Sequence, residues 1–343
     1  MKVIELTEYD EKWDKFLNKY PHLVFHRPEW KKFIESTFKT ELKYLAVEDN
    51  NEIELLFPIG IVHSRNFGNR LVSIPFLEYG GFAGNPKNLN LIINLIKEAY
   101  PKYDFLQVRE GVPEKYLLEN NFQKFEEAKR FTLELQKPEV LWEKIDKQKR
   151  KAVRKAQEMK VTVSNIGHKE IPKLYELYYN NMKKFGSPPY PKEYFVNYFT
   201  YMVDKQLAKP LGAYLDGKLI AALLGFTYKN KVHITISASD EQFLEYRPND
   251  LLHWEFIKWA AENNFKVFDF GIARENTGHF RFKQLWNTEV KPLNNYYLFL
   301  NKKERSIINP DDPQYERKKK LFQKLPKFIS LRLGKKLREE LAI

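Results

Sequence analysis

The chain has 343 residues, which exceeds the size of a usual single hydrophobic core and predicts two domains. Its 43% apolar content suffices for globular cores, and the absence of cysteine excludes disulfide bonds, thiolate catalysis and Cys-ligated zinc. The formal net charge is +13. Because the amino terminus lacks the apolar core of a signal peptide and no apolar run approaches the ~20 residues of a membrane span, we expect a cytoplasmic protein.

The positive charge is concentrated in two segments. Residues 144–160 contain eight Lys or Arg and two acidic residues, and residues 317–343 contain ten Lys or Arg and two acidic residues. The rest of the chain is nearly neutral. The charge therefore predicts anionic partners at defined places rather than a general affinity for anions.

The first half of the chain predicts an α/β unit. Its apolar periodicity alternates between the helical and the strand repeat, and turn residues separate the segments. The expected helices are 11–20, 28–37 and 89–100, and the expected strands are 23–25, 42–48, 53–62, 71–76 and 105–108.

The second half repeats this order of elements with similar spacing. Strands are expected at 211–215, 219–228, 232–237 and 267–270, with a helix at 250–263 before the last of them. Two units with matching order predict a duplicated α/β module. A further strand at 293–300 is expected to return to the first sheet.

A basic helix is expected ahead of the second unit, at residues 140–159. Lys147, Arg150, Lys151 and Arg154 are spaced by three and four, so they form one positive ridge along it. Such a ridge is either a solvated helix face or a binding surface for an anion, and the residues alone leave both interpretations open. An aromatic helix at 175–185 and a Pro-rich loop at 186–191 follow.

The stretch 268–286, FDFGIARENTGHFRFKQLW, contains the most distinctive pattern of the chain. A strand stops at Gly271, a polar loop with turn-forming residues follows, and two aromatic residues then alternate with two cations. An ordinary strand, loop and helix start with solvated cations would also produce this pattern.

Several of these segments together resemble FemABX-like proteins of the GNAT acyltransferase superfamily, relatives of the peptidoglycan bridge-forming aminoacyltransferases. The resemblance covers roughly residues 25–297. It rests on the following segments: Phe25-His26-Arg27-Pro28-Glu29-Trp30, Ser73-Ile74-Pro75-Phe76 with Tyr79-Gly80-Gly81, the basic run 149–156, Asn249-Asp250-Leu251-Leu252, and the FDFG and FK elements of 268–286.

The resemblance implies an α/β (α+β) fold of tandem GNAT-like domains, each a mixed twisted sheet flanked by helices, with a basic C-terminal helical tail. We expect the first domain at 1–137, the second and catalytic domain at 138–305, and the tail at 306–343. In this fold two central strands separate, and their free backbone N–H groups hold the reacting carbonyl. The residues 232–237 and 267–270 would be those strands in the second domain.

The resemblance also implies a set of site residues. Lys283, the Lys of the FK pair, would stabilise the developing oxyanion or the phosphate-bearing end of the donor, and Asp269 would accept a proton or, alternatively, cap the following loop. Lys32 is preferred to Lys31 as the substrate-binding Lys near the first Trp. The expected substrate-binding residues are Arg150, Arg154, Lys32, Glu78, Tyr79, Tyr178, Tyr190 and Phe282.

The expected function is formation of an amide on an amino group of a cell-envelope precursor, peptide- or sugar-linked and carried by a nucleotide or a lipid. Because the chain offers no cysteine and no nucleophilic-serine motif, direct attack by the acceptor amine is the simpler route. No metal and no bound cofactor are expected. One alternative is an acyl-CoA-dependent N-acetyltransferase, and another is a non-catalytic RNA- or membrane-binding module.

The donor is predicted from the turn at 245–250, which precedes the helix that would hold the pyrophosphate of CoA. This turn has no glycine, and Asp250 would cap the helix but repel a phosphate. The pattern therefore favours aminoacyl-tRNA over acyl-CoA, with the basic segments contacting RNA phosphates.

The C-terminal residues 317–341 alternate cations with apolar side chains. A basic amphipathic segment of this kind lies on an anionic membrane, contacts RNA, or packs as a terminal helix with a solvated cationic side. The first of these interpretations would place the cytoplasmic protein peripherally at the inner face of the membrane.

Overall fold

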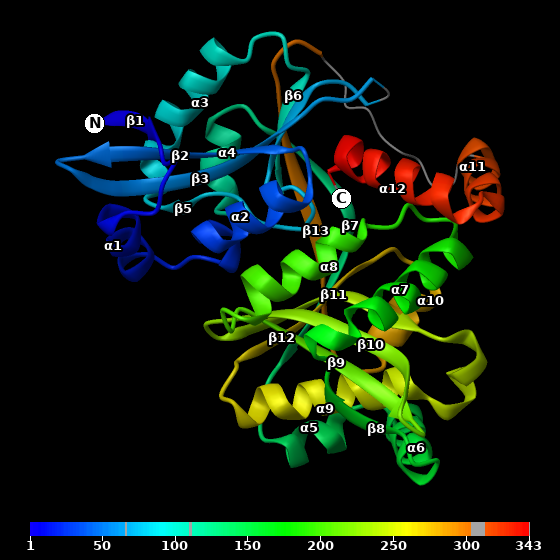
Figure 1. The fold of residues 1–343 in the computed structure, drawn as a ribbon. Coiled ribbons are helices and arrows are strands. Elements are labelled where there is room, and N and C mark those ends of the chain that lie inside the picture. The colour runs from blue at the N-terminus through cyan, green and yellow to red at the C-terminus, as the bar shows by residue number, and fades with distance from the viewer. Residues whose placement is uncertain (66, 110–111, 303–312, 343) are drawn as a thin grey trace. The chain divides into compact units, whose positions relative to one another are not determined.

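The computed structural model describes residues 1–65, 67–109, 112–302 and 313–342, with the side chains of 313–315 outside the description. The chain forms two compact units (Figure 1). One comprises Met1–Glu127, Asn294–Arg317 and Leu331–Ile343, and the other comprises Ala128–Leu293 and Lys318–Ser330. The predicted domain boundaries stay a prediction. The expected boundary between the second domain and the tail falls within residues 303–312, which lie outside the described residues.

The first unit is a mixed sheet with helices on it. The sheet runs in the order β1 (Lys2–Glu5), β2 (Glu41–Asp49), β3 (Glu52–Val62), β4 (Arg70–Ser73), β6 (Phe105–Arg109) and the second half of β13 (Glu289–Phe299), and β5 (Ala83–Gly84) pairs with β3. The helices are α1 (Glu11–Lys19), α2 (Pro28–Thr37), α3 (Leu89–Ala99) and α4 (Glu114–Glu119).

The alternation of side chains along β2 explains how helices are held on both faces of this sheet. Leu45 belongs to the apolar cluster that includes Ile92 and Ile96 of α3. Its neighbour Tyr44 points the other way, where its ring lies 5.0 Å from that of Trp13 on α1. Both faces of the strand are therefore buried.

The paired strands of the second unit run in the order β8 (Thr162–Asn165), β9 (Ala208–Leu215), β10 (Lys218–Tyr228), β11 (Lys231–Ser239), β12 (Val267–Ala273) and the second half of β7 (Gln123–Glu134). Its helices are α5 (Pro138–Lys144), α6 (Lys147–Glu158), α7 (Ile171–Phe185), α8 (Lys192–Tyr198), α9 (Pro248–Glu262) and α10 (Gly278–Gln284). Helix α9 packs on β9, β10 and β11, and it also contacts α5 and α6 (Figure 1). Helix α7 packs on β10 and β11. Helices α11 (Pro313–Lys324) and α12 (Lys327–Leu341) end the chain.

The two sheets have the same sequence of strand directions. In each, three antiparallel pairings are followed by one parallel pairing and then by one antiparallel pairing. The helix that joins the parallel strands is α3 in the first unit and α9 in the second. The sixth strand of the first sheet is β13, which confirms the predicted return of residues 293–300. This matching topology agrees with the predicted duplication.

The strand expected to stop at Gly271 continues to Ala273, and three further expected elements differ from the structure. The segment 23–25 is part of a 3₁₀ turn, Val24–His26, rather than a strand. The helix expected at 140–159 is two helices, because Asp146 caps α6 by accepting a hydrogen bond from the Gln148 backbone N–H. The strand expected at 71–76 ends at Ser73, since Ile74 has a φ of 47°, which a β-strand cannot contain.

The C-terminal end of α12 packs into the first unit. The guanidinium of Arg70 donates to the Glu340 carbonyl oxygen at 2.6 Å, and that of Arg109 donates to the Ala342 carbonyl oxygen at 3.1 Å. The Phe76 backbone N–H donates to the same Ala342 oxygen at 2.8 Å. Both arginines are buried, so the last turn of the chain supplies hydrogen-bond acceptors to charges that water does not reach.

Deletion of residues 339–343 should therefore destabilise the protein. Hydrogen bonds to a charged group are each worth about 1.5–3 kcal/mol, and we expect a loss of roughly 3 kcal/mol in the free energy of unfolding, measured by urea denaturation. Arg332→Ala, at an exposed position of the same helix, is the control. An unchanged unfolding midpoint in the deletion variant would show that these contacts contribute nothing to stability.

Candidate functional site

A cavity of about 500 Å³ lies within the second unit. Helix α6, the turn before α9, the start of α9 and helix α10 supply its walls. The side chains that line it are predominantly cationic and apolar, with one acid. They are Gln148, Lys149, Lys151, Ala152, Lys155, Arg247, Asp250, Gly278, Phe282 and Leu285.

Lys149 joins the three helices that line this cavity. Its ammonium donates to a carboxylate oxygen of Asp250 on α9 at 2.6 Å. The same nitrogen lies 3.5 Å from the ring centroid of Phe282 on α10, a cation–π distance. Burial lowers the pKa of Lys149, and the charge of Asp250 opposes part of that effect. Lys149 thus neutralises Asp250, the acid that we expected from the sequence to repel a phosphate.

A neutral histidine lies behind this pair. Burial lowers the pKa of His253 to about 3, the hydrogen bond to Asn249 opposes this, and the charges of Lys149 and Lys283 add to the lowering. Its Nδ1 lies 2.7 Å from the Asn249 carbonyl oxygen. Because a carbonyl can only accept, Nδ1 carries the proton, which leaves Nε2 as the acceptor of the ring. His253 also stacks against Phe270 with 5.6 Å between centroids.

Helix α9 begins without a side-chain cap, which corrects the expectation for Asp250. The residue at the cap position is Arg247, whose φ of 56° is left-handed, and Pro248 occupies the first helical position. Asp250 is the third residue of the helix, and its carboxylate pairs with Lys149 instead. The turn that the sequence identified as lacking glycine therefore presents the side chain of Arg247 to the cavity.

The predicted ridge of α6 divides between two faces. Lys151 lines the cavity, and Lys155, one turn further, lies on the same face. Arg150 and Arg154, the residues chosen from the sequence, face α5. Arg150 donates to the carbonyl oxygens of Glu143 and Ile145, both at 2.7 Å, and so closes the C-terminal end of α5.

Arg154 is exposed, and its guanidinium lies 5.7 Å from the ring of Trp142. These contacts give Arg150 and Arg154 a packing role on α5, and neither residue lines the cavity. Substrate binding by either residue stays a prediction that the geometry of this unit does not favour.

Strands β11 and β12 separate after a short parallel pairing. They pair only from Lys231 to His233 on β11 and from Val267 to Asp269 on β12. Beyond this point β12 has a register shift against β7, and Gly271 has a φ of 71°, which favours glycine. Strand β11 continues to Ser239 along β10. The separation lies where the sequence places it.

Asp269 is fully buried and holds β12 to β7. One of its carboxylate oxygens accepts from Nε and Nη2 of Arg130 at 3.0 and 2.5 Å, and the other accepts from the Gly271 backbone N–H at 2.9 Å. Burial alone would raise the pKa of Asp269, but the nearby charges of His233 and Arg130 lower it to about 2. A carboxylate this acidic is a poor proton acceptor, so the geometry favours the structural alternative over a catalytic base.

The two residues of the FK pair face different surroundings. Helix α10 begins at Gly278, with Thr277 as its cap, so both residues of the pair lie on a helix. Phe282 lines the cavity, whereas the Lys283 ammonium donates to the Ile272 carbonyl oxygen on β12 at 2.7 Å. The hydrogen bond fixes Lys283 beside the part of β12 that has separated from β11. This position agrees with the predicted role, which stays a prediction.

Tyr178 and Tyr190 pack against each other away from the cavity lining. Tyr178 is buried, and its hydroxyl accepts from the Tyr190 backbone N–H at 3.0 Å. Their rings are stacked with 6.1 Å between centroids, and Tyr190 stacks on Tyr194 at 4.3 Å. These contacts hold the Pro-rich loop on α7, and substrate binding by the two tyrosines stays a prediction.

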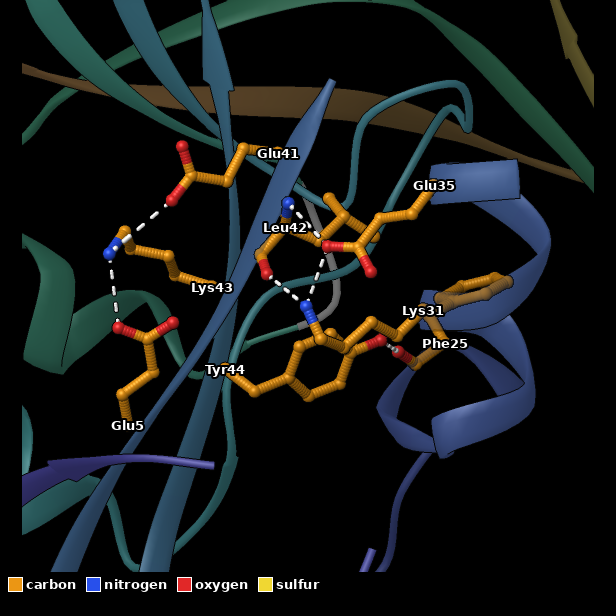
Figure 2. Close-up of polar contacts among 8 residues, drawn as sticks. All are labelled: Glu5, Phe25, Lys31, Glu35, Glu41, Leu42, Lys43 and Tyr44. Atoms are coloured by element: carbon orange, nitrogen blue, oxygen red, sulfur yellow. Dashed lines mark hydrogen bonds and ion pairs between the residues drawn. The ribbon is translucent and has the colours of Figure 1, made fainter. Parts of the chain in front are cut away.

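The first unit contains the remaining predicted residues. Figure 2 shows Lys31 of α2 between the Glu35 carboxylate and the Leu42 carbonyl oxygen, with 2.6 Å to each. Lys31 is therefore used to hold α2 on β2. Lys32 is exposed and has no ion pair among the described residues, so the preference for Lys32 is compatible with this geometry.

Glu78 and Tyr79 lie on the loop that follows β4. Glu78 is half-buried, whereas the Tyr79 ring is buried 6.1 Å from that of Phe25. In the same loop Ile74 and Phe76 have φ values of 47° and 70°, which are unfavourable for a β-branched and a bulky residue. Strained loops of this kind are concentrated at functional sites, so the loop remains a candidate.

The sequence analysis missed Lys149, Lys155 and Arg247 as cavity-lining cations. Lys155 could have been found by extending the helical repeat from Lys151 by one turn. Lys149 and Arg247 could not, because the first depends on a contact with α9 and the second on a left-handed turn.

Comparison with known proteins identifies sequence similarity to a domain family and to a curated relative. Residues 143–284 match the family model described as an acetyltransferase (GNAT) domain. A lipid II:glycine glycyltransferase of Staphylococcus haemolyticus is 29% identical over 133 residues, and the match covers 36% of this chain and 30% of that protein. The match thus spans about a third of the length of the staphylococcal protein.

Solved structures extend the similarity to most of the chain. The crystal structure of FemX has a TM-score of 0.70 at 14% identity, covering 88% of this chain and 98% of that one. A tandem GNAT protein from the clavulanic acid biosynthesis pathway has a TM-score of 0.57 at 10% identity, with 88% and 99% covered. At these identities the similarity concerns the fold, and it confirms the predicted tandem GNAT-like architecture.

The role of Asp269 can be tested by its stability signature. We expect Asp269→Asn to lower the free energy of unfolding at pH 7 by roughly 3 kcal/mol, because it leaves the Arg130 guanidinium without its buried carboxylate. The pKa of Asp269 is depressed to about 2, so its contribution is complete above its ordinary pKa and is lost as the pH falls toward 2. The difference in free energy of unfolding between wild type and variant, measured by urea denaturation, should therefore shrink as the pH falls from the ordinary pKa of an aspartate toward 2.

Glu158→Gln, which changes an exposed carboxylate of α6, is the control and should leave the free energy of unfolding nearly unchanged. A variant at Asp269 that keeps the wild-type stability but loses turnover would instead show that this carboxylate is a catalytic base.

Proposed function

We propose that this FemABX-like chain, which carries a GNAT-type domain at residues 143–284, transfers an aminoacyl group to an amino group of a cell-envelope precursor. The resemblance to FemABX-like proteins is supported by the GNAT family model, the glycyltransferase similarity and the FemX fold. The named activity of the staphylococcal relative supports the reaction type.

The observation that carries this proposal is the cationic cavity inside the GNAT-type domain. Lys151, Lys155 and Arg247 face it, and no ion pair with an acid is present for these three among the described residues. In the part of the chain that the structure describes, Asp250 is the one acid of the lining, and Lys149 neutralises it. Such a surface is suited to a donor that carries phosphates close to its acyl group.

The reaction follows from chemistry that the chain can supply without a covalent enzyme intermediate. The acceptor amine attacks the donor carbonyl carbon, a C–N bond forms, and the C–O bond to the ribose of the donor breaks. The amine proton passes to the departing ribose oxygen. Lys283 stabilises the negative charge that develops on the carbonyl oxygen. The backbone of β11 that has no partner on β12 offers N–H groups to the same oxygen.

Aminoacyl-tRNA is the donor we favour, and no bound cofactor is required. Its 3′ end would bring phosphates to Lys151, Lys155 and Arg247, and the lack of glycine before α9 restricts the close backbone approach that CoA pyrophosphate uses. An acyl-CoA-dependent N-acyltransferase is the second candidate. It is favoured by the same cations, which surround the first turn of α9.

The acceptor we favour is carried by a lipid, since the relative's name specifies lipid II. None of the helices among residues 1–65, 67–109, 112–302 and 313–342 has the length and apolar composition that crossing a membrane needs. To modify a lipid-carried acceptor, the protein would contact the membrane peripherally. We propose that the basic tail makes this contact and that the protein is cytoplasmic, at the inner face of the membrane.

Replacement of Lys283 tests the catalytic assignment. We expect Lys283→Ala to lower turnover by about 10²-fold or more, the order of magnitude for loss of one oxyanion-stabilising contact. Lys283→Arg should retain only part of the turnover that Lys283→Ala loses, because a planar guanidinium does not reproduce a compact ammonium. The assay is aminoacyl transfer to a precursor fraction, with thermal melting measured in parallel.

Arg281→Ala removes an exposed cation from the same helix and serves as the matched control, with turnover close to wild type. Wild-type turnover in a folded Lys283→Ala protein would remove Lys283 from the mechanism.

A further inference from the structure

The junction of α11 and α12, residues 318–330, presents both positive charge and apolar surface. It contains five lysines and no acid. Within it Leu321 is 64% exposed and Phe328 is 74% exposed, the latter being the more exposed of the two. We call these residues the α11–α12 corner. Large apolar side chains at such exposure, in a segment with five lysines, need an explanation beyond ordinary solvation.

The corner, which belongs to the second unit, is docked on α7 and on the residue that follows it. The Ser330 hydroxyl lies 2.8 Å from that of Tyr179 on α7, and the Gln323 amide donates to the Lys184 carbonyl oxygen at 2.6 Å. At Gly186 an added Cβ would lie 2.6 Å from the Lys319 carbonyl oxygen, so the two backbones pack closely. The exposure of Leu321 and Phe328 is therefore a property of a docked element.

The apolar side chains of α11 divide between two sides. Phe322 is buried, whereas its neighbour Leu321 is exposed. Lys318 and Lys324 lie three residues before and after Leu321, so the helical repeat places all three on one face. That face is amphipathic in an unusual sense, because its apolar residue and its cations both point to solvent.

The cations of the corner are largely uncompensated. Lys318, Lys320 and Lys324 are exposed, and none has an ion pair with an acid among the described residues. Lys327 lies 5.1 Å from the ring of Tyr179. At the end of α7, beside the close approach of Gly186, Phe185 adds a further apolar side chain that is 43% exposed. The corner and the end of α7 thus contribute exposed cations together with three exposed apolar side chains.

We propose that the α11–α12 corner inserts Leu321 and Phe328 into the interface of an anionic phospholipid membrane while its lysines bind the lipid head groups. An anionic bilayer is complementary to both features, since it offers phosphates at the surface and hydrocarbon just below it. RNA offers phosphates but no burial for an exposed leucine. This inference rests on the proposed function, because a lipid-carried acceptor is the reason that the protein would need a membrane-binding surface.

The test is binding of the full chain to vesicles of phosphatidylglycerol and phosphatidylcholine, measured by co-sedimentation at physiological salt. We expect wild type to bind these vesicles and not vesicles of phosphatidylcholine alone. The double variant Leu321→Ser/Phe328→Ser should bind at least 10-fold more weakly, and so should the triple variant Lys318→Glu/Lys320→Glu/Lys324→Glu. Leu118→Ser, at a 47% exposed position on α4, is the matched control and should bind as wild type does.

Two results would overturn the inference. One is a wild-type protein that does not bind the anionic vesicles, and the other is a double serine variant that binds as wild type does. If the lysine variant alone loses binding and loses RNA binding in parallel, the corner is a nucleic-acid surface. All substitutions are at exposed positions, and circular dichroism is used to check that each variant is folded.

Failure of the membrane-binding inference can be distinguished from failure of the proposed reaction. Turnover of a water-soluble, nucleotide-linked precursor should be unchanged in the double serine variant, because this assay needs no membrane. Vesicle binding together with a complete lack of aminoacyl transfer would count against the proposed reaction and leave the membrane contact in place.

Discussion

The ion pair between Lys149 and Asp250 is the interaction on which the cavity depends. It connects α6 to the first turn of α9, and the ring of Phe282 on α10 covers the same ammonium. Removing either partner would leave a buried charge, which is strongly destabilising. The pair also decides the electrostatics of the cavity, because it leaves Lys151, Lys155 and Arg247 as the charges that a ligand meets. A helix start with an acid in its first turn thereby becomes compatible with an anion.

The second constraint is the early end of the pairing between β11 and β12. Gly271 and the register shift around it turn β12 away after Asp269, and the Arg130–Asp269 ion pair fixes the strand at that point. The Lys283 ammonium binds the backbone of β12 just beyond, at Ile272. One strand irregularity therefore positions both a gap in the sheet and the cation that we propose acts there. Asp269, for which the resemblance implies proton acceptance or a structural role, makes the contacts that fix this geometry, and a catalytic role for it stays a prediction.

The sequence predicted the fold well because its signals were local. The apolar periodicity of 28–37 and 53–62 coincides with α2 and with all but the first residue of β3, and the matched order of elements agrees with two sheets of the same topology. The site was harder to predict, because it depends on contacts between distant residues. Arg150 and Lys149 are adjacent in sequence, yet the first closes α5 and the second lines the cavity. No local pattern distinguishes them, since the choice depends on where α5 and α9 pack against α6.

We propose that this chain moves an aminoacyl group from an RNA ester to an envelope precursor. The most direct measurement supplies the purified chain with a precursor fraction and either aminoacyl-tRNA or acetyl-CoA, and follows the mass of the precursor. We predict that the precursor gains the mass of an aminoacyl residue from the RNA ester and gains nothing from the thioester. Acetyl transfer from CoA with no transfer from aminoacyl-tRNA would contradict the proposed donor, and absence of transfer from both would contradict the proposed function.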